Sequence, residues 1–192
     1  YFVFVAGWPI LVVCLTSLTV AYFYSAGPRP LGKLAMGMPL VFFFMGPIIV
    51  LGAYYVQSRA FTLEAFLVSM PVACLVTAIL VANDLRDLEE DFASGKITPV
   101  TLFGRLVGKC MWILLVAGAF SWVIVLVMLI GQTWLLFLSF LAFPISVKGM
   151  RTLWKGEDRN TLSVSLWESA RLHWWVGVLL AGGVVLGRFV PF

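Results

Sequence analysis

Charged residues are scarce in this chain: aspartate, glutamate, lysine and arginine together make up 11% of 192 residues, and histidine occurs once. The three cysteines lie far apart without a CxxC pair, which gives no basis for a disulfide framework and is typical of packing residues. No segment alternates with the period of a barrel strand. Hydrophobic residues are abundant at 62%. With a mean hydropathy of +1.04, they predict an integral membrane protein.

Apolar runs long enough to cross a bilayer define the predicted architecture. A spanning helix needs roughly 20 residues, and backbone in lipid must satisfy its hydrogen bonds within the helix. We therefore predict an all-α fold, a polytopic membrane helix bundle in which residues 1–192 form a single membrane domain with six transmembrane helices. The predicted spans cover about residues 2–24, 40–56, 63–82, 110–130, 134–147 and 172–190, the fifth being short.

Basic residues predict the orientation of the bundle, because short loops rich in lysine and arginine stay in the cytoplasm. Eleven of the 13 basic residues follow the first, third and fifth predicted spans, whereas Arg59 and Arg188 fall on the opposite side. We expect a multi-pass protein of the cell inner (cytoplasmic) membrane, with its active site facing the cytoplasm. The sequence pI of about 9.2 reflects this topology and membrane lipid, and nothing suggests nucleic acid as a partner.

The segment from Asn83 to Asp91 directly follows the third apolar run and holds five of the nine acidic residues. On a helix, Asp84, Asp87 and Asp91 are spaced i, i+3 and i+7, so their carboxylates share one face with the amide of Asn83. Oxygen ligands of this kind suit Mg²⁺, which commonly bridges one or two carboxylates to a substrate phosphate. The segment therefore predicts a cation site at the end of a membrane helix.

The charges around this segment leave a second interpretation open. It is a solvated helix end in which Arg86 pairs with Glu90 and the other charges face water. Lys96 follows the turn residues Ala-Ser-Gly and is placed to reach the same ligand as the carboxylates. Arg105 and Lys109 either hold phosphate oxygens or only satisfy the positive-inside rule.

Several motifs are similar to those of one known family. The sequence NDLRDLEED at residues 83–91, followed by Gly95-Lys96 and Gly104-Arg105, resembles the second aspartate-rich motif of the UbiA superfamily of intramembrane aromatic prenyltransferases. The sequences YSAGPRPLG at 24–32, FMGP at 44–47, GAYYVQ at 52–57 and RLH at 171–173 resemble the branch that prenylates 1,4-dihydroxy-2-naphthoate in menaquinone biosynthesis.

This resemblance implies a longer protein, because members of the family have about nine spans and two acidic motifs. The chain then corresponds to the C-terminal two-thirds, a fragment lacking the N-terminal helices and the first Asp-rich motif, which agrees with its start at Tyr1. The pattern departs in two places. Met38 stands where we expect an acidic residue, and Lys33 where an aromatic residue is less surprising.

The resemblance also implies an activity. The enzyme transfers a polyprenyl group from a polyprenyl diphosphate to an aromatic acceptor, with Mg²⁺ as cofactor. Metal ligands are Asp84, Asp87 and Asp91; catalytic residues are Asp87, Asp91, Lys96 and Tyr24; substrate-binding residues are Asn83, Asp84, Arg29, Lys33 and Arg105.

Other functions remain open at this point. The acceptor is 1,4-dihydroxy-2-naphthoate or another aromatic compound such as 4-hydroxybenzoate. From a different class, a cation transporter uses a ring of acids at its entrance, although, apart from Glu64 at the start of the third, we expect no acid inside a span. A third alternative is a non-catalytic structural subunit. For a prenyltransferase, we expect a lipid-open groove for the apolar tail, for which Phe42, Phe43 and Phe44 are candidate lining residues.

Overall fold

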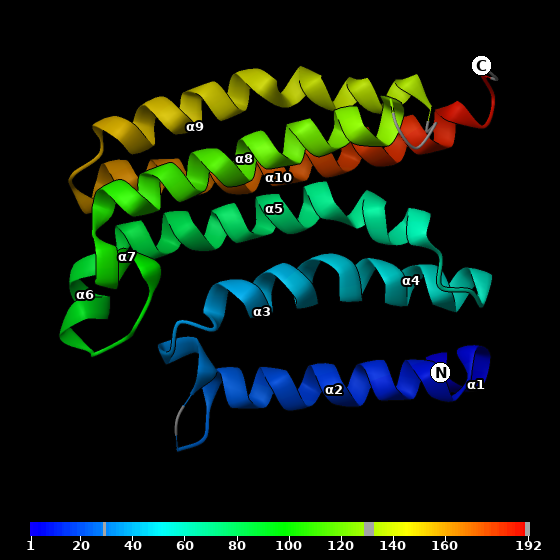
Figure 1. Ribbon diagram of the computed structural model, residues 1–192, viewed down its shortest axis with the longest axis horizontal. Coiled ribbons are helices and arrows are strands. Elements are labelled where there is room, and N and C mark those ends of the chain that lie inside the picture. The colour runs from blue at the N-terminus through cyan, green and yellow to red at the C-terminus, as the bar shows by residue number, and fades with distance from the viewer. Residues whose placement is uncertain (29, 129–132, 191–192) are drawn as a thin grey trace.

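The computed structural model describes residues 1–28, 30–128 and 133–190, and within these ranges the chain is helical without a strand. Long helices run side by side along the molecule (Figure 1). The elements are α1 (Phe2–Ala6), α2 (Trp8–Ser25), η1 (Leu31–Lys33), α3 (Gly37–Phe43), η2 (Phe44–Ile48), α4 (Ile49–Ser58), α5 (Leu63–Arg86), α6 (Leu88–Ala93), α7 (Pro99–Phe103), α8 (Arg105–Met128), η3 (Trp134–Ala142), α9 (Phe143–Lys155) and α10 (Arg159–Gly187).

Within the residues that the structure describes, six helical stretches are long and apolar enough to span a membrane, which confirms the all-helical fold and the six predicted spans. The second is continuous through α3, η2 and α4, where Pro47 falls within a π-helical turn because proline cannot donate the regular backbone hydrogen bond. The fifth, η3 with α9, has 22 residues, so the prediction of a short fifth span was wrong.

The last span also differs from its prediction, because α10 begins at Arg159 and not near residue 172. Asp158 caps the helix by accepting a hydrogen bond from the Thr161 amide at 2.9 Å. An apolar run ends at the first charges, but a helix continues to its cap. The longer α10 includes Glu168, which is 7% exposed and accepts from Lys148 of α9 at 2.5 Å. The expectation of no acid inside a span was therefore wrong, although this acid is ion-paired.

Helices α5, α8 and α10 form the centre of the bundle, and their facing side chains, among them Val81, Val123 and Leu172, are almost fully buried. Two indole groups join α8 to its neighbours. Trp112 donates to the Ser169 hydroxyl of α10 at 2.9 Å, and Trp122 donates to the Leu67 carbonyl of α5 at 2.8 Å. Both indole N–H groups therefore find a partner on a neighbouring helix, which ties α8 to α10 and to α5.

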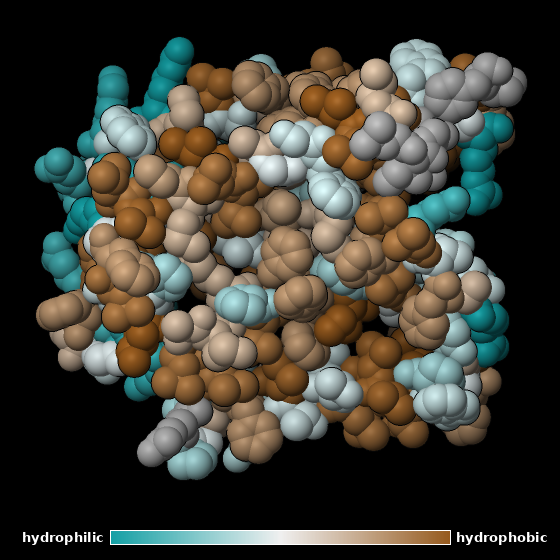
Figure 2. All heavy atoms as spheres, viewed as in Figure 1, coloured by the Kyte–Doolittle hydropathy of each residue, from teal (hydrophilic) through white to brown (hydrophobic). Residues whose placement is uncertain are grey.

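Polar side chains concentrate at the two ends of the molecule, and apolar side chains cover most of the face between them (Figure 2). The end that holds α6 and α7 is called the charged end below. It carries most of the charged loops, whereas Arg59 and Arg188 follow the opposite ends of their helices. This division matches the alternation of basic and non-basic loops in the sequence.

Two glycines of α10 allow a close helix contact. A Cβ at Gly183 would lie 2.6 Å from the Leu135 carbonyl oxygen, and one at Gly187 would lie 2.5 Å from Thr133. Both neighbours belong to η3 or its N-cap. The GxxxG spacing is therefore a packing contact between α10 and the start of the fifth span.

We expect Gly183→Ala to destabilise the protein by about 1–3 kcal/mol, because the added methyl group meets backbone atoms that cannot move independently. The neighbouring Gly182→Ala is a matched control, since no atom lies within 4 Å of its added Cβ. Thermal unfolding of both variants in detergent checks the difference. Equal midpoints for the two variants would contradict the contact.

Candidate functional site

The acidic segment is divided between two helices. Asn83 and Asp84 belong to the last turn of α5, and Asp91 belongs to α6. Asp87 lies between the helices with φ −99° and ψ 14°, so the helix bends there and does not continue regularly as the spacing argument assumed. After α6 the chain reverses at Gly95, whose φ of 70° lies in a region that favours glycine. This reversal brings Lys96 back towards both helices.

Lys96 joins two of the predicted site carboxylates. Its Nζ lies 2.9 Å from Asp84 Oδ1 and 2.6 Å from Asp91 Oδ2. The Asp84 side chain is only 3% exposed and that of Asp91 is 14% exposed, so the ammonium compensates charges that water reaches poorly. Burial alone lowers the pKa of Lys96, but its hydrogen bonds to Asp91 and Asp84 outweigh burial and raise that pKa. Lys96 is therefore a cation at neutral pH.

Asp87 faces a different set of cations. Arg86 Nε donates to Asp87 Oδ1 at 2.7 Å, and Arg159 Nη2 lies 3.3 Å from the same oxygen. The hydrogen bond from Arg86 lowers the pKa of the Asp87 carboxyl. Arg86 Nη2 also donates to Asn83 Oδ1 at 2.8 Å. Because Glu90 pairs with Arg159, the Arg86–Glu90 pair of the alternative interpretation was wrong.

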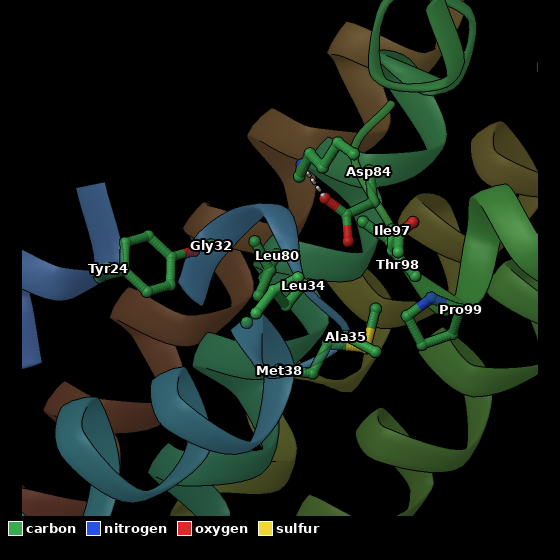
Figure 3. A pocket seen from close by; sticks show the side chains of 12 residues that line it. Tyr24, Gly32, Leu34, Ala35, Met38, Leu80, Asp84, Ile97, Thr98 and Pro99 are labelled. Atoms are coloured by element: carbon green, nitrogen blue, oxygen red, sulfur yellow. Dashed lines mark hydrogen bonds and ion pairs between the residues drawn. The ribbon is translucent and has the colours of Figure 1, made fainter. Parts of the chain in front are cut away.

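A small pocket lies beside the Asp84–Lys96 pair (Figure 3). Tyr24 approaches it from the end of α2, while Thr98 and Pro99 line it from the start of α7. Its volume of about 10 Å³ is room for one water. Further apolar lining comes from Leu34, Ala35, Met38, Leu80 and Ile97.

The buried Met38 therefore lies in the site itself. The position where the chain departs from the expected acidic residue contributes an apolar wall and no charge.

An apolar groove of about 520 Å³ runs between α2 and the α3–η2–α4 span. It extends from Tyr24 at the charged end to Ile10 and Gly52 near the other end, and Tyr24 lines both this groove and the small pocket. Phe44 contributes to its wall, whereas Phe43 is 52% exposed. Of the three candidate phenylalanines, only Phe44 lines the groove.

The remaining predicted site residues are the three basic ones, and they differ in their position relative to the pocket. Lys33 is exposed, and its carbonyl accepts a hydrogen bond from the Ile97 amide at 2.8 Å, which joins the loop after α2 to the loop before α7. Arg105 does not line the pocket of Asp84 but lies 3.3 Å from Glu89. Arg29 lies outside the described residues.

Two residues of the site were missed from the sequence. Thr98 lines the pocket and caps α7, and the pair Thr98-Pro99 is a helix-start signal that could have placed it. Arg159 contacts Asp87 from a position 72 residues later. No local pattern indicates so distant a partner.

The carboxylates of the acidic segment partly fit a metal ion. Among the described residues, no group of three or more His, Cys, Asp or Glu side chains is arranged to hold one. Asp84 and Asp91 nevertheless converge on a single cation, the ammonium of Lys96. Two carboxylates with oxygen donors fit a hard divalent cation that takes its remaining ligands from water and phosphate.

The chain is similar in sequence to known proteins of one family. The model of the UbiA prenyltransferase family matches residues 1–176. A "1,4-dihydroxy-2-naphthoate octaprenyltransferase" of Bacillus subtilis is 28% identical, over 96% of this chain and 59% of the relative. A "2-carboxy-1,4-naphthoquinone phytyltransferase" of Synechocystis is 25% identical, over 92% and 58%. A Mycobacterium tuberculosis protein with the same name as the Bacillus one is 28% identical, over 95% and 61%.

The chain thus spans about three-fifths of the length of these curated relatives. No solved structure gives a significant match.

Proposed function

This chain belongs to the UbiA prenyltransferase family, and we propose that the full-length protein transfers a polyprenyl group from a polyprenyl diphosphate to an aromatic acceptor. The proposed acceptor is 1,4-dihydroxy-2-naphthoate, which is named in the Bacillus and Mycobacterium relatives, so that the reaction is a step of menaquinone biosynthesis. The observation that carries the proposal is the Asp84–Lys96–Asp91 cluster at the end of an apolar groove. It suits a ligand with a diphosphate head and a hydrocarbon tail.

The head of the donor would bind at the charged end. We propose Mg²⁺ held by Asp84 and Asp91, with Asp87 as a further ligand once it leaves its contacts with Arg86 and Arg159; the ion would neutralise the diphosphate and favour its departure. Lys96, already a cation beside two of these carboxylates, would donate hydrogen bonds to diphosphate oxygens as negative charge develops on them. Asn83 is proposed to support the same site, either as a direct oxygen ligand or through Arg86, whose Nη2 donates to its side-chain oxygen at 2.8 Å.

Lys33 and Arg29 are proposed to have a less direct role in binding the substrates. Lys33 is joined to the site by its backbone, and its exposed side chain would attract the diphosphate or the acceptor carboxylate. Arg29, in the same loop, is proposed to act likewise. For Arg105 the geometry gives no support to substrate binding, because it pairs with Glu89 away from the pocket.

The proposed reaction is an electrophilic substitution. The bond between C1 of the prenyl group and the diphosphate oxygen breaks, and its electron pair leaves with the diphosphate. The allylic cation then forms a carbon–carbon bond with the electron-rich ring, and the carboxyl group of the naphthoate leaves as carbon dioxide. Tyr24 lies where the groove meets the small pocket, so its ring would stabilise the allylic cation through its π face.

The groove supports the proposal from the apolar side. Its lining from α2 and the second span is almost entirely hydrocarbon, with Cys14, Ser17 and the Tyr24 hydroxyl as the polar exceptions. A polyprenyl tail placed there would bury apolar surface without leaving any backbone group unpaired.

We further propose that the charged end faces the cytoplasm and that the protein resides in the cell inner membrane. The support is the distribution of basic loops, which the helices bring to one end of the bundle.

A transfer assay on the full-length protein in membranes tests the proposal. It offers a polyprenyl diphosphate with either 1,4-dihydroxy-2-naphthoate or 4-hydroxybenzoate, with Mg²⁺ or with a chelator. We expect a prenylated naphthoquinol that forms only with the metal. Product from 4-hydroxybenzoate alone would reject the menaquinone branch, and no product from either acceptor would reject the prenyl transfer activity.

A further inference from the structure

A second hollow, of about 550 Å³, opens at the charged end between the start of α8 and the end of α9. It offers two cations, two carboxylates, an indole and an aliphatic side chain, contributed by Glu89, Arg105, Leu106, Lys109, Trp154 and Glu157. None of these residues lines the pocket of Asp84 and Tyr24 or the apolar groove. It is therefore distinct from that pocket and that groove, although Glu89, Arg105 and Glu157 also line a smaller hollow with Arg86 and Arg159, the two arginines that contact Asp87.

The two cations of this hollow retain donors for a further ligand. Arg105 Nη1 is buried and has no hydrogen-bond partner among the described residues, while its Nη2 donates to Glu89. Lys109 Nζ donates to the carbonyls of Trp154 at 2.9 Å and Gly156 at 3.4 Å. An ammonium has three donors, and within the described ranges no carboxylate lies within 4.0 Å of Lys109 Nζ. An anionic group would accept hydrogen bonds from the unused donors of both Arg105 and Lys109.

The two carboxylates make a simple anion a poor match for the same hollow. The Glu89 side chain is 91% exposed although it contacts Arg105, and the exposed Glu157 forms no ion pair within the described part of the chain. Two cations beside two carboxylates complement a zwitterion, in which a phosphate and an ammonium lie a few bonds apart.

The surroundings of the hollow are those of a membrane interface. Trp154 is 52% exposed, as is common for a tryptophan at the boundary between lipid and water. Along α8, Leu106 and Leu114 are 63% and 70% exposed, and they continue from the hollow towards the apolar middle of the molecule. Hydrocarbon chains of a ligand would therefore follow this stripe.

From these contacts we propose that the hollow binds the headgroup of an aminophospholipid. The phosphate lies against Arg105 and Lys109, the primary ammonium lies against Glu89 and Glu157, and the acyl chains lie along the exposed stripe of α8. Charge complementarity selects this occupant over an anionic lipid such as phosphatidylglycerol, whose headgroup carries no positive charge for the two carboxylates.

Lipid titration of the full-length protein in detergent, followed by native mass spectrometry, tests the proposal. The probes are phosphatidylethanolamine, phosphatidylcholine and phosphatidylglycerol with identical acyl chains. We expect phosphatidylethanolamine to bind about fivefold more tightly than phosphatidylcholine, because a quaternary ammonium has no N–H to donate. Equal affinities for the three lipids, or tighter binding of phosphatidylglycerol, would overturn the proposal.

Single variants test the phosphate contacts and the ammonium contacts separately. Lys109→Gln and Arg105→Gln are each expected to weaken phosphatidylethanolamine binding about tenfold. Glu157→Gln removes no ion pair within the described residues, and we expect it to reduce the preference over phosphatidylcholine, because only Glu89 then accepts from the primary ammonium.

Arg151→Gln is the matched control, because this exposed arginine of α9 does not line the hollow. Retention of the full lipid preference in Glu157→Gln would overturn the assignment of the ammonium. These readouts do not depend on prenyl transfer.

Discussion

Replacing Asp84 or Asp91 by asparagine in the full-length protein is expected to lower prenyl transfer by about two orders of magnitude or more. Each carboxylate contacts the Lys96 ammonium, at 2.9 and 2.6 Å, and the amide keeps the shape of the side chain while removing its charge. The measurement is the initial rate of product formation in membranes, normalised to the amount of protein inserted.

Glu90→Gln is the control for these variants. Glu90 precedes Asp91 on α6, but its side chain is 61% exposed and pairs with Arg159, so its loss is expected to change the rate less than about twofold. Wild-type rates in both aspartate variants would exclude the cluster from the reaction. A loss in Glu90→Gln as large as theirs would mean that the effect belongs to the folding of the segment and not to the two carboxylates.

Replacing Lys96 by methionine is expected to destabilise the protein by about 2 kcal/mol or more and to abolish transfer. The Asp84 side chain is 3% exposed, and without Lys96 its charge would be buried with no cation in hydrogen-bond contact, which is costly. Thermal unfolding in detergent measures the loss. Lys155→Met, at an exposed position of α9, is expected to change stability within about 0.5 kcal/mol.

A double variant distinguishes the ion pair from general packing. If the cost comes from the unpaired carboxylate, Asp84→Asn combined with Lys96→Met should be less destabilised than the sum of the two single variants. Strict additivity of the two single effects would contradict the importance of the pair for stability. Activity should stay low in the double variant in either case, because the cation and the charge are both lost.

Hydrophobic runs predict the membrane class, the all-helical fold and six spans, because length and apolarity suffice to identify a spanning helix. They do not predict where the helices end. The apolar run begins at Leu172, but α10 begins earlier, at Arg159. Glu168 and Arg171 interrupt the apolar pattern, although Glu168 is buried and accepts a hydrogen bond from Lys148 of α9. A polar residue inside a span is recognised only when its partner on another helix is known.

The candidate site was only partly predictable, for a related reason. Spacing along the chain placed Asp84, Asp91 and Lys96 in one neighbourhood, and the turn at Gly95 explains why these three meet. It did not reveal that Arg159 contacts Asp87 from another span, nor that Met38 lines the pocket. Contacts between helices depend on how the helices are rotated against each other, and periodicity within one helix does not determine this rotation.

The two indole hydrogen bonds of α8 restrict how the molecule can move. Trp112 and Trp122 are ten positions apart, about 15 Å along the helix axis, and they bind different neighbours, α10 and α5. A helix that is bonded to two neighbouring helices at two points along its length resists both rotation about its axis and translation along it. We therefore expect any opening of the charged end to involve the short segments α6 and α7 more than a shift of α8.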